Sequence, residues 1–171
     1  MQNLGSCRLG QSPDKMISLT TRQEISNSAL MMTKQSSKKL EIISKNLEPS
    51  IYNQSDFVDA IKNLALNGRR AQIRILVSDI ESIINVNHRL LSLCSKLPSF
   101  IKIRKISPEY KNFNKALLIA DRIGYIYREN ASRYEGSVNF NSPRYCKNYL
   151  NLFEEMWEMA LLDRNLRRLN V

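Results

Sequence analysis

The chain has 171 residues, of which 43% are hydrophobic and 25% are charged. This length can bury the core of one domain but is too short for two ordinary ones, and the composition is typical of a soluble globular protein. The formal net charge is +10, and residues 69–147 hold fifteen Lys and Arg against six acids. Such an excess favours an acidic partner, without choosing among nucleic acid, an anionic lipid surface and an acidic protein.

The sequence has no signal for a membrane or for an oxidising compartment. No apolar run approaches the eighteen or so residues that a membrane span needs, and residues 1–11 lack the apolar segment of a secretory signal. The three cysteines lie far apart, and the single His cannot form a metal-binding cluster with them. We therefore expect a cytoplasmic protein with free thiols, no transmembrane segment, no metal and no other cofactor.

Periodicity and cap residues divide the chain into a tail and one domain. Residues 1–17, rich in Ser, Gln and Asn, predict a flexible tail, and residues 18–171 predict a single domain. In chain order, the expected elements are a helix over 22–38, a strand over 39–44, a helix from the cap Ser55 to Gly68, a strand over 71–77, a helix from the cap Asp79 to Pro98, a strand over 100–106, a hairpin of strands 116–120 and 125–128, and a helix that begins at Ser142. This order, α-β-α-β-α-β-β-β-α, predicts an α/β domain with a layered, mixed β-sheet flanked by helices.

Two local patterns support these elements. Thr21 and Glu24 fit a capping box, in which the Thr oxygen accepts from a first-turn N–H and the Glu reaches back toward the cap. The strand over 100–106 alternates apolar and basic residues, which predicts one buried face and one wet, positively charged face.

Several segments carry a resemblance to a known family: Lys39–Ser44, Phe57–Leu66, Gly68–Val77, Lys115–Arg128 and the closing helix with Phe153 and Trp157. Together they resemble one half of a phospholipase D-like (HKD) domain, over roughly residues 20–160. More narrowly, the phrases at 21–24, 47–52, 87–91 and 133–136 are similar to an uncharacterised bacterial domain of unknown function. That domain often follows a GNAT acetyltransferase domain on longer chains.

The resemblance implies a His-x-Lys-x4-Asp pattern at the start of the hairpin. Anchored on Lys115, the His position holds Phe113 and the Asp position holds Ala120, with Asp121 one residue late. The His of this family is the nucleophile that forms a phospho-enzyme, so a Phe cannot replace it. The Gly-Ser-Val-Asn at 136–139 resembles a second family motif but comes too late in the chain. We therefore expect a degenerate half-domain with no catalytic residues of the family type.

Basic residues on or beside the strands are the candidate anion contacts: Lys102, Arg104, Lys115 and Arg128. Ligands of open α/β sheets bind near strand ends, and charge-assisted hydrogen bonds hold phosphate well. The alternative is that these side chains only solvate a sheet edge and discourage edge pairing.

Five further residues are candidates for function: His88, Arg89, Asp121, Arg133 and Glu135. His titrates near neutral pH, although a surface His that bonds a nearby carbonyl is the simpler interpretation of His88. Asp121 most simply begins the hairpin turn, and Arg133 and Glu135 most simply form an ion pair or hold a loop.

These observations favour a non-catalytic phospholipase D-like module that binds or regulates, with an anionic partner such as nucleic acid. One alternative is a phosphodiesterase or nuclease that uses His88 with Lys115. Another is a partner in trans for a separate acetyltransferase. We also expect a homodimer, because the family's catalytic centres form between two such halves.

Overall fold

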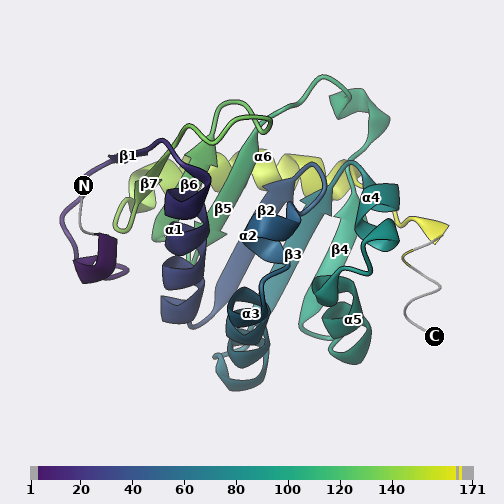
Figure 1. Cartoon of the computed structure of the whole chain (residues 1–171), viewed down its shortest axis with the longest axis horizontal. Helices are drawn as coiled ribbons and strands as arrows, with labels where there is room; N and C mark the ends of the chain where they lie inside the picture. The colour runs from purple at the N-terminus through teal and green to yellow at the C-terminus, as the bar shows by residue number, and fades with distance from the viewer. Residues whose placement is uncertain (1–3, 165, 167–171) are drawn as a thin grey trace.

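The computed structural model describes residues 4–164 and 166 as a seven-stranded sheet with helices on both faces (Figure 1). The strands are β1 (Ile17–Leu19), β2 (Lys39–Ser44), β3 (Gln72–Val77), β4 (Ile101–Lys105), β5 (Ala116–Ala120), β6 (Gly124–Arg128) and β7 (Gly136–Asn139). The α-helices are α1 (Arg22–Gln35), α2 (Pro49–Tyr52), α3 (Ser55–Asn67), α4 (Ile80–Asn85), α5 (Arg89–Lys96) and α6 (Pro143–Met159), with short 3-10 turns at Leu4–Ser6 and Pro108–Tyr110.

The sheet is mixed, with the order β1-β7-β6-β5-β2-β3-β4. β2, β3 and β4 run parallel, whereas β5 pairs antiparallel with β2, and β6, β7 and β1 continue antiparallel. This confirms the predicted α/β class with a layered, mixed sheet flanked by helices.

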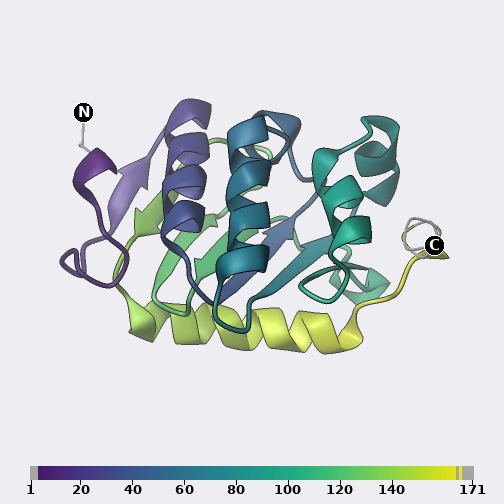
Figure 2. The same cartoon turned by 90° about the horizontal axis from the view of Figure 1, so that it is seen from below.

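Helices α1, α3 and α5 cover one face of the sheet, and α6 crosses the other face (Figure 2). Because strand side chains alternate between faces, neighbouring residues of β2 serve two cores. Leu40 and Ile42 belong to the larger cluster that α1, α3 and α5 complete. Ile43 belongs to a smaller cluster on the other face, where α6 contributes Phe153 and Met156, both fully buried.

The turn between β5 and β6 is held by the side chain of Asp121. One carboxylate oxygen accepts from the Ser37 N–H at 2.7 Å, and the other accepts from the Lys38 and Lys39 N–H groups at 2.8 and 2.9 Å. Asp121 and Arg122 both have positive φ, 52° and 60°, as the central residues of a type I′ turn do. The predicted role of Asp121 as a turn residue therefore extends to fixing the start of β2, which lies next to β5.

The segment before β1, predicted to be a flexible tail, is hydrogen-bonded to the domain from Cys7 onward. The Leu9 N–H donates to the Gln35 side chain at 2.7 Å, whose amide donates to the Cys7 carbonyl at 3.1 Å. The Gly10 N–H donates to the Phe140 carbonyl at 2.9 Å. These contacts are not those of a loose tail, and composition misses them because each partner lies far along the chain. Residues 1–3 of that predicted tail lie outside the described residues.

Strands β1 and β7 were absent from the predicted elements. They pair with each other, with Ile17 opposite Val138, and β7 also pairs with β6, where Ser137 lies opposite Tyr127. The Gly-Ser-Val-Asn segment that resembled a late motif is thus β7 itself. Strands of three and four residues leave too short an alternation for a local pattern to predict.

The helices confirm two predicted caps and correct others. Thr21 accepts from the Glu24 N–H at 3.1 Å, and Asp79 accepts from an N–H in the first turn of α4 at 3.1 Å. Ser55 is the first helical residue of α3 rather than its cap, and the buried hydroxyl of Ser142 makes no cap bond to α6.

Helix lengths also differ from those expected. The single helix expected between Asp79 and Pro98 is two helices, α4 and α5, separated by residues 86–88, and α1 ends at Gln35 rather than at residue 38. In the part of the chain that the structure describes, no helix has both the length and the apolar character to cross a membrane.

Replacing Asp121 should destabilise the fold through the β5–β6 turn. We expect Asp121→Ala to lower the free energy of unfolding by about 2 kcal/mol, because three backbone N–H groups lose a charged acceptor. Asp121→Asn keeps one acceptor oxygen and tolerates positive φ, so its effect should be smaller. Chemical denaturation measures both, with Asp59→Ala on α3 as control. If Asp121→Ala were as stable as the control, the Asp121 carboxylate would not stabilise the contact between the β5–β6 turn and the start of β2.

Candidate anion-binding site

A cationic cavity lies at the carboxyl ends of the parallel strands. Four lysines line it, Lys45, Lys105, Lys111 and Lys115, in a volume of about 350 Å³. They follow β2, end β4, belong to the β4–β5 connection and precede β5. Among the described residues that line the cavity there is no Asp or Glu. We call this cavity the lysine pocket.

Strand register brings these lysines together. β2 and β5 are antiparallel, with Ile43 opposite Leu117, so continuing the register by two residues sets Lys45 opposite Lys115. β4 runs parallel to β2 through β3, so Lys105 at its end lies at the same edge. Like charges that face each other across a sheet repel, and a bound anion would relieve that repulsion.

Lys115 is held in its charged form. Its Nζ lies 3.0 Å from the Tyr127 hydroxyl and 2.9 Å from a Glu129 carboxylate oxygen, and the Tyr127 hydroxyl also donates to Glu129. The hydrogen bond to Tyr127, followed by that to Glu129, raises the pKa of Lys115 above its ordinary value. An ammonium group has three donors, so one remains for a ligand.

The remaining lysines differ in how far they are neutralised. Lys105 lies 3.9 Å from an Asp163 carboxylate oxygen. Among the described residues, neither Lys45 nor Lys111 has a carboxylate within ion-pair distance, and both are exposed. The pocket therefore has an excess of positive charge.

Two buried serines and one aromatic ring complete the lining. The hydroxyls of Ser44 and Ser107 accept from the N–H groups of Leu47 and Glu109 at 3.0 and 3.4 Å, which leaves the hydroxyl protons for a ligand. Phe113, for which the sequence resemblance predicts the nucleophile position of the HKD pattern, lines the same pocket. The pocket thus combines donors suited to a phosphate with one hydrocarbon ring.

The predicted anion contacts do not form one site. Only Lys115 of the four lies in the lysine pocket. Lys102 and Arg104 line another cavity with Trp157, near the amino ends of β3 and β4. Asp121 lies at the far end of β5 from Lys115.

The prediction that Arg128 is an anion contact is wrong, because its side chain is buried and already paired. Its side chain is 2% exposed and pairs with Glu48 at 2.5 Å. The same guanidinium donates to the carbonyls of Ala131 and Arg133 at 2.7 Å each. The side chains of Arg133 and Glu135 are exposed, so the 131–133 loop is held through backbone carbonyls. A charged residue in a strand suggested exposure, but partners distant in sequence bury it.

His88 is a buried cap rather than a surface residue. It is 1% exposed, its Nε2 lies 2.9 Å from the Leu47 carbonyl oxygen, and its Nδ1 accepts from the Leu90 N–H at 3.2 Å. Arg89 is exposed, and both its N–H and its guanidinium bond Asn53, which ties α5 to the end of α2. The partners of His88, Leu47 and Leu90, belong to the core under α1, α3 and α5, whereas Tyr127, the partner of Lys115, packs on the α6 side. No contact joins His88 to Lys115 among the described residues.

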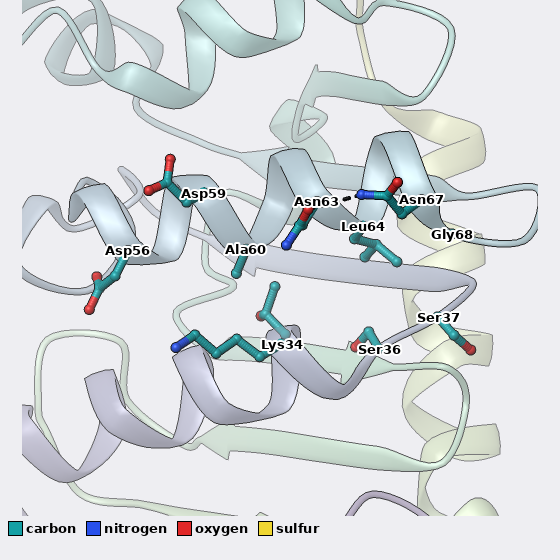
Figure 3. A pocket seen from close by; sticks show the side chains of 11 residues that line it. Lys34, Ser36, Ser37, Asp56, Asp59, Ala60, Asn63, Leu64, Asn67 and Gly68 are labelled. Carbon is teal, nitrogen blue, oxygen red and sulfur yellow. Dashed lines mark hydrogen bonds between the residues drawn. The ribbon is translucent and has the colours of Figure 1, made fainter.

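A second cavity, of about 410 Å³, lies between α1 and α3 (Figure 3). Lys34 lies on one wall and Asp56, Asp59 and Asn63 on the other, with Asn63 bonded to Asn67 at 2.9 Å. This cavity therefore contains side chains of both charge signs, unlike the lysine pocket. Among the described residues, no group of three His, Cys, Asp or Glu side chains could hold a metal ion.

The sequence did not indicate Lys45, Lys105 and Lys111 as site residues. Each follows, ends or connects strands, where a lysine usually serves only solubility. The signal that could have found them is their common position at the carboxyl ends of the parallel strands, where ligands of open α/β sheets bind.

This arrangement defines a phospholipase D-like α/β fold, and solved structures share it. NucT from Helicobacter pylori matches with a TM-score of 0.64 at 16% identity, over 86% of this chain and 98% of its own. Nuc from Salmonella typhimurium, a phospholipase D family member, matches with a TM-score of 0.58 at 13% identity, over 85% and 97%. At such identities the likeness shows the fold alone.

An archaeal chromatin protein, TrmBL2, described as having a novel mode of DNA binding, matches with a TM-score of 0.64 at 14% identity, over 88% of this chain. This chain spans 55% of that protein. Residues 21–169 match the family described as Domain of unknown function (DUF7931), and the chain belongs to that family. No curated protein sequence matches the chain.

Breaking the Arg128–Glu48 pair should destabilise the protein strongly. We expect Arg128→Met to lower the free energy of unfolding by about 3–5 kcal/mol, because Glu48 and two loop carbonyls lose a buried donor. Chemical denaturation measures the change. Arg133→Met is the matched control, since it keeps the backbone carbonyl that Arg128 binds. Similar stabilities for the two variants would show that the buried contacts of Arg128 with Glu48 and the 131–133 loop do not stabilise the fold.

His88 should make stability fall on the acid side of neutrality. Burial lowers the pKa of His88 below its ordinary value of 6.5. Below that pH the unfolded chain takes up a proton that the folded chain excludes, so stability drops as the pH falls from 7 toward 5. Asn at a cap accepts the same backbone N–H without titrating, so His88→Asn should flatten the profile in urea denaturation across this window. An unchanged slope would remove His88 from the pH dependence.

Proposed function

We propose that this protein is a non-catalytic phospholipase D-like module that binds the phosphate backbone of a nucleic acid in the lysine pocket. One observation carries the proposal: Lys45, Lys105, Lys111 and Lys115 converge where the parallel strands end, around Phe113. Lysine ammonium groups bind phosphates as point charges, and the serine hydroxyls add neutral donors. Such a pocket holds a phosphodiester, but Phe113 cannot attack it.

Two observations favour nucleic acid over other anions. The formal net charge of +10 suits a polyanion that contacts more than one cationic cavity. An archaeal protein that shares the fold over 88% of this chain binds DNA, as its description states. The likeness to the archaeal protein is one of fold only, and a fold does not imply a function. The decisive test is therefore to change the lysines of the pocket.

The rival phosphodiesterase or nuclease with His88 and Lys115 gains no support from the geometry. A general acid or base must come within hydrogen-bond reach of the reacting group. Both ring nitrogens of the buried His88 are engaged with backbone groups of Leu47 and Leu90. A hydrolytic function would therefore need other residues.

Two hypotheses about protein partners stay separate from this proposal. A stable complex recovered from the native host would support the acetyltransferase partner that relatives of this sequence suggest. A particle of twice the chain mass in light scattering would support the homodimer. The lysine pocket needs neither, because all its lining residues come from one chain.

Nucleic-acid binding should depend on salt and on the lysines of the pocket. We expect the affinity for a fluorescein-labelled oligonucleotide to fall steeply with salt, because bound lysines displace counterions. The Lys45→Gln/Lys105→Gln double variant should bind more weakly and should reduce the salt slope by about 1 for each phosphate that it no longer binds. Fluorescence anisotropy over a salt series measures both quantities. The oligonucleotide should stay intact on a denaturing gel.

The matched control is Lys34→Gln/Lys62→Gln, which removes the same charge from exposed positions on α1 and α3. This control should keep most of the affinity. An equal drop in affinity for the two double variants would show general charge attraction and contradict a site in the pocket. Cleavage that depends on Lys115 would instead support the hydrolytic rival.

A further inference from the structure

A further cavity, lined by three cationic side chains, lies against β3 and β4 beside α6. It has a volume of about 210 Å³ and extends from the amino ends of these strands to Arg104. Its lining residues are Gln72, Ile73, Arg74, Ser99, Phe100, Lys102, Arg104 and Trp157. We call it the Arg104 pocket. The inference drawn from it goes beyond the proposed function, because it would stand even if the lysine pocket bound nothing.

Arg104 is held in one orientation with its charge unpaired. Its guanidinium carbon lies 4.2 Å from the centre of the Trp157 ring, and one guanidinium nitrogen donates to the Trp157 carbonyl at 3.1 Å. No ion pair of Arg104 with a carboxylate occurs within the described chain. A guanidinium fixed on an aromatic ring keeps its remaining donors ready for an anion, at little further cost in side-chain entropy.

The neighbours of Arg104 add charge, donors and an exposed ring. Lys102 alternates with Arg104 on β4 and so projects from the same face of the sheet; it is exposed. Gln72 and Ser99 provide neutral polar groups. Phe100, directly before β4, lines the pocket and is 37% exposed, so part of its ring is accessible to a ligand.

Arg74 contributes less to the charge of the pocket than its position suggests. Both its terminal nitrogens bond Glu154, at 2.9 and 2.5 Å, and one also lies 3.3 Å from Glu41. The net positive charge therefore comes from Lys102 and Arg104. Both lie on β4, the last strand in the order of the sheet, whose end is bonded to Leu161.

We propose that the Arg104 pocket binds a nucleoside phosphate, with the phosphate on Arg104 and Lys102 and the base against Phe100. Arginine planes and aromatic rings stack on bases, and this stacking requires bases that are not already paired inside a duplex. The ligand is thus a free nucleotide or one unit of a single strand. A simple anion would use the two cations but not Phe100.

The only tryptophan of the chain reports on this pocket directly. Trp157 lines the Arg104 pocket and does not line the lysine pocket. We expect a thymidine decanucleotide to change Trp157 emission in a saturable way, alongside the anisotropy of a labelled copy. A separate titration with AMP tests the free nucleotide. Tighter binding of the decanucleotide identifies a single strand as the ligand, and equal or tighter binding of AMP identifies a free nucleotide.

Three variants test the named contacts. Lys102→Gln and Phe100→Ser change exposed side chains and should each weaken the Trp157 response by about tenfold in concentration. Arg104→Lys keeps the charge but loses the planar stack, and should weaken it as well. Lys62→Gln and Leu66→Ser, at exposed positions on α3, are the matched controls and should respond as the unmodified protein does.

Two results would overturn the inference. One is unchanged Trp157 emission at concentrations where anisotropy shows the decanucleotide bound, which would leave the lysine pocket as the site and the proposed function intact. The other is an equal response to inorganic phosphate, which would mean that the base is not recognised. The Trp157 response to AMP should be retained in Lys45→Gln/Lys105→Gln, which would show that the Arg104 pocket binds its ligand without the lysine pocket.

Discussion

The position of the candidate site depends on one constraint, the reversal of strand direction between β2 and β5. Because β2, β3 and β4 are parallel, the residues that follow them meet at one edge of the sheet, and because β5 is antiparallel to β2, it begins at that same edge. Lys115, which precedes β5, is thereby set beside Lys45, which follows β2. A parallel β5 would have carried Lys115 to the opposite edge. The Asp121 clamp secures this pairing at the far end, since it joins the end of β5 to the backbone that enters β2.

Basic residues in this protein have two physical roles, which differ in whether the side chain pairs with a carboxylate. Arg128 and Arg74 are paired with carboxylates and stabilise the interior. Lys45 and Lys111 stay exposed at cavities, and Arg104 is fixed on Trp157 without a carboxylate. The first group offsets the cost of burying charge, and the second leaves charge available to a ligand. The proposed binding of a phosphodiester depends on lysines of the second group, which line the lysine pocket.

Much of the fold was predictable because its signals are local. The runs of β-branched residues in β2 and β3 and the caps at Thr21 and Asp79 predict the elements that the structure contains. The site was predictable only in part. From the sequence, Arg128 was expected to be an exposed anion contact. Its partner Glu48 lies 80 positions away, so no local pattern indicates that the two side chains pair in the interior. His88 suggested a reactive side chain, because the break between α4 and α5 that it caps was not predicted. Lys45 and Lys105 carry no local signal, since their common edge exists only once the strands are paired.

The central claim is that the lysine pocket holds an intact phosphodiester. A crystal structure of the protein grown with a short single-stranded oligonucleotide tests it most directly. The claim predicts an uncleaved phosphodiester whose oxygens lie about 3 Å from the Nζ atoms of Lys115 and Lys45, with Phe113 beside it. A strand bound elsewhere with the lysine pocket empty, or a terminal phosphate left by cleavage next to Lys115, would contradict it.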